Sequence, residues 1–320
     1  MNTSANARSS EVPTSTIAAL SCSNLSKNFG PKVALNALTL DIPSQGVTAI
    51  LGENGAGKTS LISCALGLHQ PSSGKITLLG SPAGAPNTKK LVGVMLQNSD
   101  LPDLLSAREH IHLFQSYYDE PLAVEELCEL CNLKSFIDTP YKGLSGGQKR
   151  CVQFALAILG QAKVVFLDEP TTGLDVAARQ TIWATIKAIS KKGTAVILTT
   201  HYLEEADALS DHIIVMKQGS IVAEGTTEKV KESAHGDLIY CSSTLDVSQL
   251  KQVKHIKSAK KNGKQLELKV DDASKALKLL FSLDPSLSDL IIRKSNLEDA
   301  FLELSRAEHT EIKQDNSQGA

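Results

Sequence analysis

The chain has 320 residues, of which 42% are hydrophobic and 21% are charged, and its formal net charge is −2. This amount of apolar material is enough for one large core and a second, smaller one. The nearly balanced charge gives no electrostatic reason to expect a nucleic-acid-binding protein. The longest apolar runs, such as residues 154–159 and 195–198, are far shorter than the ~18–20 residues that a membrane-spanning helix needs.

The pattern of elements divides the chain into two predicted domains and two tails. Residues 1–16 are rich in Ser, Thr, Ala and Asn and lack the apolar segment of a secretory signal, so we expect a disordered tail there. We expect the same of residues 309–320. Between the tails, the element pattern changes near Ala234-His235-Gly236. We therefore predict a large domain over residues 17–235 and a small accessory domain over residues 236–308.

The first predicted elements are strands over residues 20–25, 38–42 and 47–51, followed by a helix from Lys58 to about Leu68. Between the third strand and the helix lies Gly52-Glu53-Asn54-Gly55-Ala56-Gly57-Lys58-Thr59, which fits the phosphate-loop pattern G-x-x-x-x-G-K-[ST]. Its glycines let backbone N–H groups cradle a phosphate, Lys58 would neutralise the β- and γ-phosphates, and Thr59 would ligate Mg²⁺. We predict a nucleotide site that includes the whole phosphate loop (residues 52–59) and Ser60.

A helical region is predicted over about residues 99–159. Ser106-x-x-Glu109 has the form of a capping box that opens a helix over residues 107–118, and a second helix is predicted over residues 122–133. Cys128-x-x-Cys131 has a metal-like spacing, but no second such pair accompanies it, and the two positions share a helix face. We therefore expect packing thiols there.

The third helix of this region begins at the pentapeptide Leu144-Ser145-Gly146-Gly147-Gln148. Ser145 can cap the helix, while Gly146 and Gly147 leave backbone N–H groups open to an anion. The phosphate loop already provides one anion site in this chain, so the role of a second one at the pentapeptide has to be explained.

An apolar run over residues 164–167 ends in Asp168-Glu169. Open α/β sheets place ligands at the carboxyl ends of their strands, so Asp168 could hold Mg²⁺ and Glu169 could polarise an attacking water. Two acids alone would more simply be a solvated turn. Further strands over residues 195–199 and 213–216 alternate with helices, including one over residues 176–192. This alternation predicts a parallel sheet covered on both faces.

The last part of the chain follows a different order, strand–helix–strand–strand–helix–strand. This order predicts a small α+β domain of the ferredoxin-like type with one extra helix, opened by Ser295-x-x-Glu298 and ending at about Arg306.

Together, the phosphate loop, the pentapeptide and Asp168-Glu169 resemble the ATP-binding cassette of ABC transporters over roughly residues 17–230. The resemblance implies an α/β P-loop NTPase fold with a helical subdomain at about residues 99–159, binding ATP and Mg²⁺. It implies catalytic roles for Glu169, His201 and Lys58, and Mg²⁺ ligation by Thr59, Gln97 and Asp168. The further nucleotide contacts that it implies are the adenine-stacking Phe29, where the family more often has Tyr, and Gln97, Ser145, Gly146, Gly147, Gln148 and Asp175.

In the family that this chain resembles, the pentapeptide of one subunit covers the ATP bound to the phosphate loop of the other. The implied partner is a second copy of the chain or a related cassette in a head-to-tail dimer. The segment from Ser295 to Leu304 resembles the closing helix of bacterial multidrug- and antibiotic-export ATPases. It implies a peripheral exporter subunit at the cytoplasmic face of the inner membrane, bound to an integral membrane permease of the type-2 class.

Two questions stay open at this point. Leu101 and Leu104, which follow Gln97, could receive a permease helix or could merely pack the helical region onto the core. The alternative to a transporter is a soluble ABC-type ATPase that regulates or accompanies nucleic acid, and it would need a basic surface. The only candidate surface comprises Lys257, Lys260, Lys261 and Lys264 around a predicted hairpin, and we interpret it as a solvated loop. No nucleic-acid partner is predicted.

Overall fold

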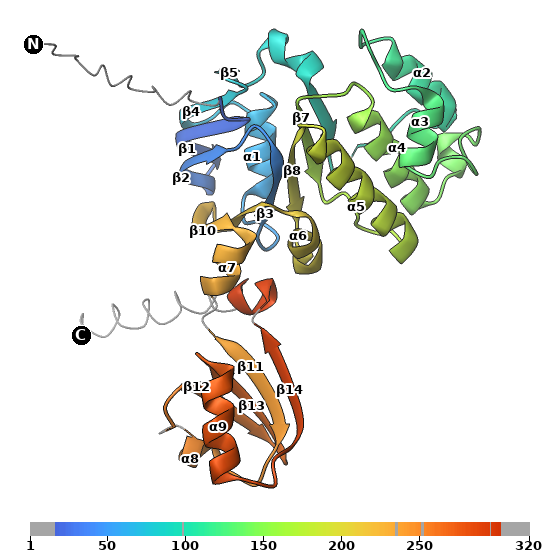
Figure 1. Cartoon of the computed structure of the whole chain (residues 1–320). Coiled ribbons are helices and arrows are strands. Elements are labelled where there is room, and N and C mark those ends of the chain that lie inside the picture. Colours follow the sequence, from blue (N-terminus) through green and yellow to red (C-terminus); the bar gives the residue numbers. More distant parts are fainter. Residues whose placement is uncertain (1–16, 98, 234–235, 251–252, 295, 302–320) are drawn as a thin grey trace, which may run out of the picture.

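Figure 1 shows the protein as a computed structural model, in which residues 17–97, 99–233, 236–250, 253–294 and 296–301 are described. Both predicted tails, residues 1–16 and 309–320, therefore lie outside the described residues. Two sheets and most of the helices precede residue 234, and a third sheet follows it. Among the described residues, no helix combines the length and the apolar character that a membrane span requires.

A six-stranded sheet in the order β10-β9-β3-β8-β7-β6 positions the site. Its neighbouring strands are parallel except for β10, which is antiparallel to β9. Every residue of β7 and β8 is buried, as expected for a parallel sheet covered on both faces. The strands are β3 (Gly46–Leu51), β6 (Val92–Met95), β7 (Val164–Asp168), β8 (Ala195–Thr200), β9 (His212–Lys217) and β10 (Ser220–Thr226).

Seven α-helices of the described part accompany this sheet: α1 (Lys58–Ala65), α2 (Ala107–Gln115), α3 (Val124–Leu130), α4 (Gly146–Ile158), α5 (Val176–Lys191), α6 (Leu203–Leu209) and α7 (Thr227–Ser233). Two 3₁₀ helices, η1 (Pro86–Leu91) and η2 (Tyr141–Gly143), connect elements. The predicted capping box of α2 is confirmed, because Ser106 and Glu109 each bond the other's backbone N–H. Helices α2, α3 and α4 share one hydrophobic core with a face of the six-stranded sheet.

A second, antiparallel sheet has the order β2-β1-β4-β5 and comprises β1 (Leu20–Phe29), β2 (Lys32–Ile42), β4 (Ser73–Leu78) and β5 (Ser81–Pro82). Strand β4 was not predicted, because its first residues, Ser73-Gly74, are typical of a turn. In the structure Gly74 has φ +82°, and a Cβ there would lie 2.2 Å from the carbonyl oxygen of Asn24. The β1–β4 register shifts at this place, so the glycine marks a bulge within a strand.

The third sheet has the order β12-β13-β11-β14 with every pair antiparallel, which is the arrangement of a ferredoxin-like unit. It confirms the predicted element order. Its elements are β11 (Asp237–Ser242), α8 (Val247–Leu250), β12 (Ile256–Asn262), β13 (Gln265–Val270), α9 (Ala273–Leu283) and β14 (Ser288–Lys294). Ile239, Leu268 and Leu280 lie in a separate hydrophobic core that this sheet and its helices form.

After β14 the chain turns into a short helix that lies next to α7 in Figure 1. Leu297 and Ala300 are buried there in the same core as Val230 of α7. The predicted cap, Ser295, lies outside the described residues. In the described part, the backbone N–H of Asp299 donates to Asn296 Oδ1 and that of Asn296 donates to Asp299 Oδ2.

Candidate active site

The phosphate loop connects β3 to α1 at the carboxyl edge of the six-stranded sheet. At Gly57, φ is +106° and a Cβ would lie 2.5 Å from the carbonyl oxygen of Ala34, so only glycine is accommodated. The Ala56 carbonyl accepts a hydrogen bond of 3.0 Å from the backbone N–H of Gly219. The loop is therefore tied from behind to the turn between β9 and β10.

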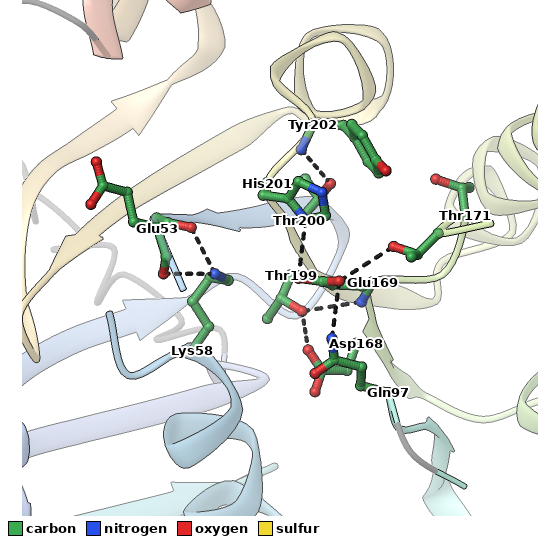
Figure 2. Close-up of polar contacts among 12 residues, drawn as sticks. Glu53, Lys58, Gln97, Asp168, Glu169, Thr171, Thr199, Thr200, His201 and Tyr202 are labelled. Atoms are coloured by element: carbon green, nitrogen blue, oxygen red, sulfur yellow. Dashed lines mark hydrogen bonds and ion pairs between the residues drawn. The ribbon is translucent and has the colours of Figure 1, made fainter. Parts of the chain in front are cut away.

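The Lys58 ammonium lies within this loop. Its Nζ donates to the Gly52 carbonyl at 2.7 Å and to the Glu53 carbonyl at 3.2 Å (Figure 2). Burial lowers the pKa of Lys58, and the nearby carboxylates of Glu169 and Asp168 partly oppose this. The loop thus holds a desolvated cation beside its own backbone, which is the arrangement that a phosphate chain would neutralise.

Asp168 is buried at the end of β7 and accepts two hydroxyl hydrogen bonds. Thr59 Oγ1 donates to Asp168 Oδ2 at 3.1 Å, and the hydroxyl of Thr199 donates to Asp168 Oδ1. A carboxylate and a hydroxyl are hard oxygen donors, the type that Mg²⁺ prefers, and here they lie within one hydrogen bond of each other. Thr59 and Asp168 therefore fit a magnesium ion at the foot of the phosphate loop.

Glu169 has a positive φ of +52°, which turns its side chain away from that of Asp168. Its Oε1 lies 3.1 Å from His201 Nδ1, and its Oε2 accepts from Gln97 Nε2 at 3.2 Å and from Thr172 Oγ1 at 3.3 Å (Figure 2). An ionised carboxylate only accepts hydrogen bonds, so Nδ1 of His201 carries the proton in this contact. The carboxylate is thereby oriented from three sides.

A cavity of about 520 Å³ joins these groups. Its lining includes Phe29, Lys58 and Thr59, and on the other side Gln97 and Glu169. This volume is in the usual range for small-molecule sites. Asn54, Gly55, Gly57 and Ser60 also line it, whereas among the described lining residues none comes from the signature pentapeptide (residues 144–148).

Three other residues predicted to contact nucleotide, Ser145, Gln148 and Asp175, form helix caps within their own segment. Ser145 caps α4 through a reciprocal pair of hydrogen bonds with Gln148. Asp175 caps α5 by accepting from the backbone N–H of Ala178 at 2.8 Å. Within one chain, the structure thus brings Lys58, Thr59, Gln97, Asp168, Glu169 and His201 together but leaves the pentapeptide elsewhere.

Arg150 is a site residue whose contacts the sequence did not reveal. Its Nη1 donates to the Leu96 carbonyl at 3.3 Å and its Nη2 donates to the Glu169 carbonyl at 3.1 Å. The guanidinium therefore connects the backbone of Leu96, which precedes Gln97, to the backbone of Glu169. The basic pair Lys149-Arg150 directly after the pentapeptide was the available signal.

Cys128 and Cys131 are both buried in the core of the helical region. Burial raises the pKa of the Cys131 thiol well above its usual range. Such thiols stay protonated and pack as small apolar groups, as the sequence predicted.

Comparison with known proteins gives consistent family matches. The family profile described as "ABC transporter" matches residues 35–172. The Nod factor export ATP-binding protein I of Mesorhizobium japonicum is 31% identical over 314 residues, covering 95% of this chain and 92% of that protein. The structure of cbiO1 from Clostridium perfringens, part of the ABC transporter complex cbiONQ, is similar with a TM-score of 0.58 and 28% identity, over 67% of this chain and 90% of that one. A dimeric post-hydrolysis state of the ATP-binding cassette MJ0796, bound to ADP and Pi, shares the fold with a TM-score of 0.59 at 24% identity, over 65% of this chain and 98% of that chain.

Proposed function

The chain belongs to the ABC transporter family as an ATP-hydrolysing subunit, and we propose that it powers export through a separate integral membrane permease. The observation that carries the proposal is the cavity that joins Lys58 of the phosphate loop to Glu169, whose carboxylate Gln97 and His201 hold. Similarity to a protein named as an export ATPase extends over nearly the whole chain, including the C-terminal sheet. This is why we favour export.

The residues of the cavity suit hydrolysis of the terminal phosphate. In our proposal the Glu169 carboxylate orients a water and accepts its proton, while the water oxygen attacks the γ-phosphorus and the bond to the β-phosphate oxygen breaks. Lys58 and the N–H groups of the phosphate loop hold the phosphates. Mg²⁺, held by Thr59 and Asp168 with Gln97 nearby, would offset the negative charge of the phosphates. His201 Nδ1 keeps the carboxylate of Glu169 aimed at the water.

The complete site in this proposal requires two chains. Ser145 caps α4, and Gly146 and Gly147 open that helix, so its N-terminus can receive an anion. The pentapeptide does not line the cavity of its own chain in the described structure. A head-to-tail dimer would place it over the ATP held by the partner, closing two sites at once.

A groove in front of Gln97 suits a permease helix. A cavity of about 280 Å³ is lined mainly by apolar side chains of the segment after α1 (Leu66 and Leu68), of β4 and of β6, and ends at Leu96. Leu68, one of its lining residues, is 59% exposed, and Leu104 of the helical region, which does not line this cavity, is 75% exposed. Leu101, by contrast, packs against the core, so we assign it to packing and retain Leu104 for docking. An exposed apolar surface beside a nucleotide-contacting residue could transmit movement to the permease.

The experiment is purification of the full chain from detergent-solubilised membranes, followed by ATPase assays with and without the co-purified membrane protein. We expect hydrolysis to be stimulated by liposomes that contain the permease, with the chain located at the cytoplasmic membrane face. A regulator associated with nucleic acid would instead be stimulated by DNA or RNA and would not co-purify with a membrane protein. The lysine hairpin gives little support for that alternative, because Lys260 lies 3.5 Å from Glu267 and Lys261 lies 3.2 Å from Asp246.

A further inference from the structure

A second cavity also lies against the phosphate loop, shares Asn54 and Gly55 with the ATP cavity, and is referred to below as the cavity behind the loop. It has a volume of about 230 Å³ and is lined by the loop residues Glu53 to Ala56, by Val222 of β10 and by the end of β9. The remaining lining residue is Phe301, which lies in the short helix that follows the C-terminal sheet. A side chain more than 240 positions along the sequence therefore backs the loop that binds phosphate.

The C-terminal side of this contact is firmly anchored. Arg293 at the end of β14 donates to both carboxylate oxygens of Asp299, at 2.9 Å and 3.1 Å. Asp299 and Asn296 bond each other's backbone N–H groups at the first turn of the short helix. Leu297 and Ala300 are buried against the cassette, with exposures of 1% and 0%. The position of Phe301 is thus set jointly by the C-terminal sheet and by the core.

The ends of the phosphate loop are held closely, whereas its middle lies against the cavity. Gly219 donates one hydrogen bond to the Ala56 carbonyl, and a Cβ on Gly52 would lie 2.4 Å from the carbonyl oxygen of Met216. Gly55, with φ +88°, adds backbone freedom in the middle of the loop. Residues Glu53 to Ala56 line a partly empty space that Phe301 also lines. The shape of the loop therefore depends on how closely Phe301 approaches.

We propose that Phe301 is a positioning residue through which the C-terminal sheet sets the affinity of the phosphate loop for ATP. A displacement of the sheet moves the short helix, changes the space behind the loop and alters how its N–H groups converge on the phosphates. The effect acts on nucleotide binding and leaves Glu169 and its partners untouched. This inference concerns ATP binding by the isolated chain and is independent of the permease.

The experiment compares Phe301→Ala with Phe281→Ala in the full chain. Phe281 lies on α9, the helix that packs on the C-terminal sheet, and is 44% exposed. It does not line the cavity behind the loop, so Phe281→Ala is a matched control. For Phe301→Ala we expect the Kd for ATP to rise about three- to tenfold, with kcat at saturating ATP changed by less than about twofold. Phe281→Ala should leave the Kd unchanged. Hydrogen exchange of the amides of residues 53–56 should be faster in Phe301→Ala alone.

An unchanged Kd and unchanged exchange in a folded Phe301→Ala protein would overturn the proposal, as would equal weakening by Phe281→Ala. Phe301→Leu, which keeps an apolar side chain but removes the ring, should raise the Kd and the loop-amide exchange less than Phe301→Ala does, but measurably above the wild type. If Phe301→Ala does not fold, loop-amide exchange in Phe301→Leu decides: faster exchange than in the wild type supports the role, and identical exchange refutes it. Absence of ATP binding by the wild type would instead contradict the family function, so the two failures are distinguishable.

Discussion

At the scale of single residues, our proposal assigns hydrolysis to a carboxylate that is not needed to hold the phosphates. Glu169 is buried, and its two oxygens contact Gln97, Thr172 and His201. Asp168, one residue earlier, contacts Thr59 of the phosphate loop instead. Neighbouring acids thus have separate tasks because a positive φ at Glu169 directs their side chains to different partners.

Glu169→Gln should therefore separate binding from turnover. The amide cannot accept a proton from water, so we expect kcat to fall about 10²–10⁴-fold while the Kd for ATP stays nearly constant. The protein should accumulate as an ATP-bound dimer, visible by size-exclusion chromatography. Glu204→Gln, at an exposed acid on α6, is the control and should keep full activity. Normal turnover in Glu169→Gln would mean that another group is the base.

Arg150→Lys tests the bridge between the Gln97 segment and Glu169. Lysine keeps the charge but cannot donate in a fixed fork to the carbonyls of Leu96 and Glu169. We expect kcat to fall about tenfold through misplacement of Glu169, with little change in the Kd for ATP. Arg179→Lys, whose guanidinium lies 3.7 Å from the exposed Glu204, is the control. Equal kcat values in both variants would contradict a positioning role for Arg150.

At this scale, the sequence predicts a site residue only where a local motif specifies its role. Lys58, Thr59 and Asp168 could be placed because their roles follow from a loop, a helix and a strand end that are local in sequence. The contact between Arg150 and the Glu169 carbonyl could not, since it depends on how α4 packs on the sheet. The metal and nucleotide roles assigned by resemblance, such as Gln97 and Asp175, stay predictions.

At the scale of elements, the strands that were predicted and missed differ in burial. Strands β3, β7 and β8 are nearly continuous apolar runs, which identify buried parallel strands. Strand β10 has no fully buried residue and β4 begins in a turn-like Ser-Gly pair, so neither carries that signal. The predicted ends of α1 and α2 were each three residues too far along the chain, because the apolar period continues into the following turn.

The N-terminus of α4 carries the element-scale prediction about the dimer. Gly147→Asp places a carboxylate where the helix dipole favours an anion, and it should damage the site completed on the partner's ATP. A mixed dimer with Lys58→Ala on one chain and Gly147→Asp on the other should keep one intact composite site, giving about half of the ATPase rate. Both changes on one chain, opposite an unmodified partner, should leave none.

The control for this pair of dimers is Gly147→Ala, which tests size without charge. A Cβ at Gly147 would lie 3.3 Å from Leu174 Cδ2, a contact that a small shift of Leu174 relieves. Gly147→Ala should therefore retain most of the activity. If instead the dimer with both changes on one chain is the active one, the pentapeptide serves the nucleotide of its own chain.

At the scale of the whole molecule, two cavities share the phosphate loop and a third ends next to Gln97. Asn54 and Gly55 line both the cavity that includes Glu169 and the cavity that includes Phe301, whereas the apolar groove ends at Leu96, the residue before Gln97. In our proposal, a movement at any of them changes the position of residues that would contact nucleotide. Binding of ATP should therefore be linked reciprocally to what docks on the groove.

Leu68, which lines the groove, and Leu104, which lies outside it, give the prediction that tests docking in the assembled transporter. Leu68→Glu and Leu104→Glu place charges on leucines that are 59% and 75% exposed, so the fold and ATP binding should survive. A charge facing an apolar permease helix would remain desolvated, and we expect loss of co-purification with the membrane protein and of permease-stimulated hydrolysis. Leu283→Glu on α9, at a leucine that is 50% exposed, is the control and should retain both. Normal co-purification of the Leu68 and Leu104 variants would place the docking surface elsewhere, whereas equal loss in the Leu283 variant would assign the effect to surface charge in general.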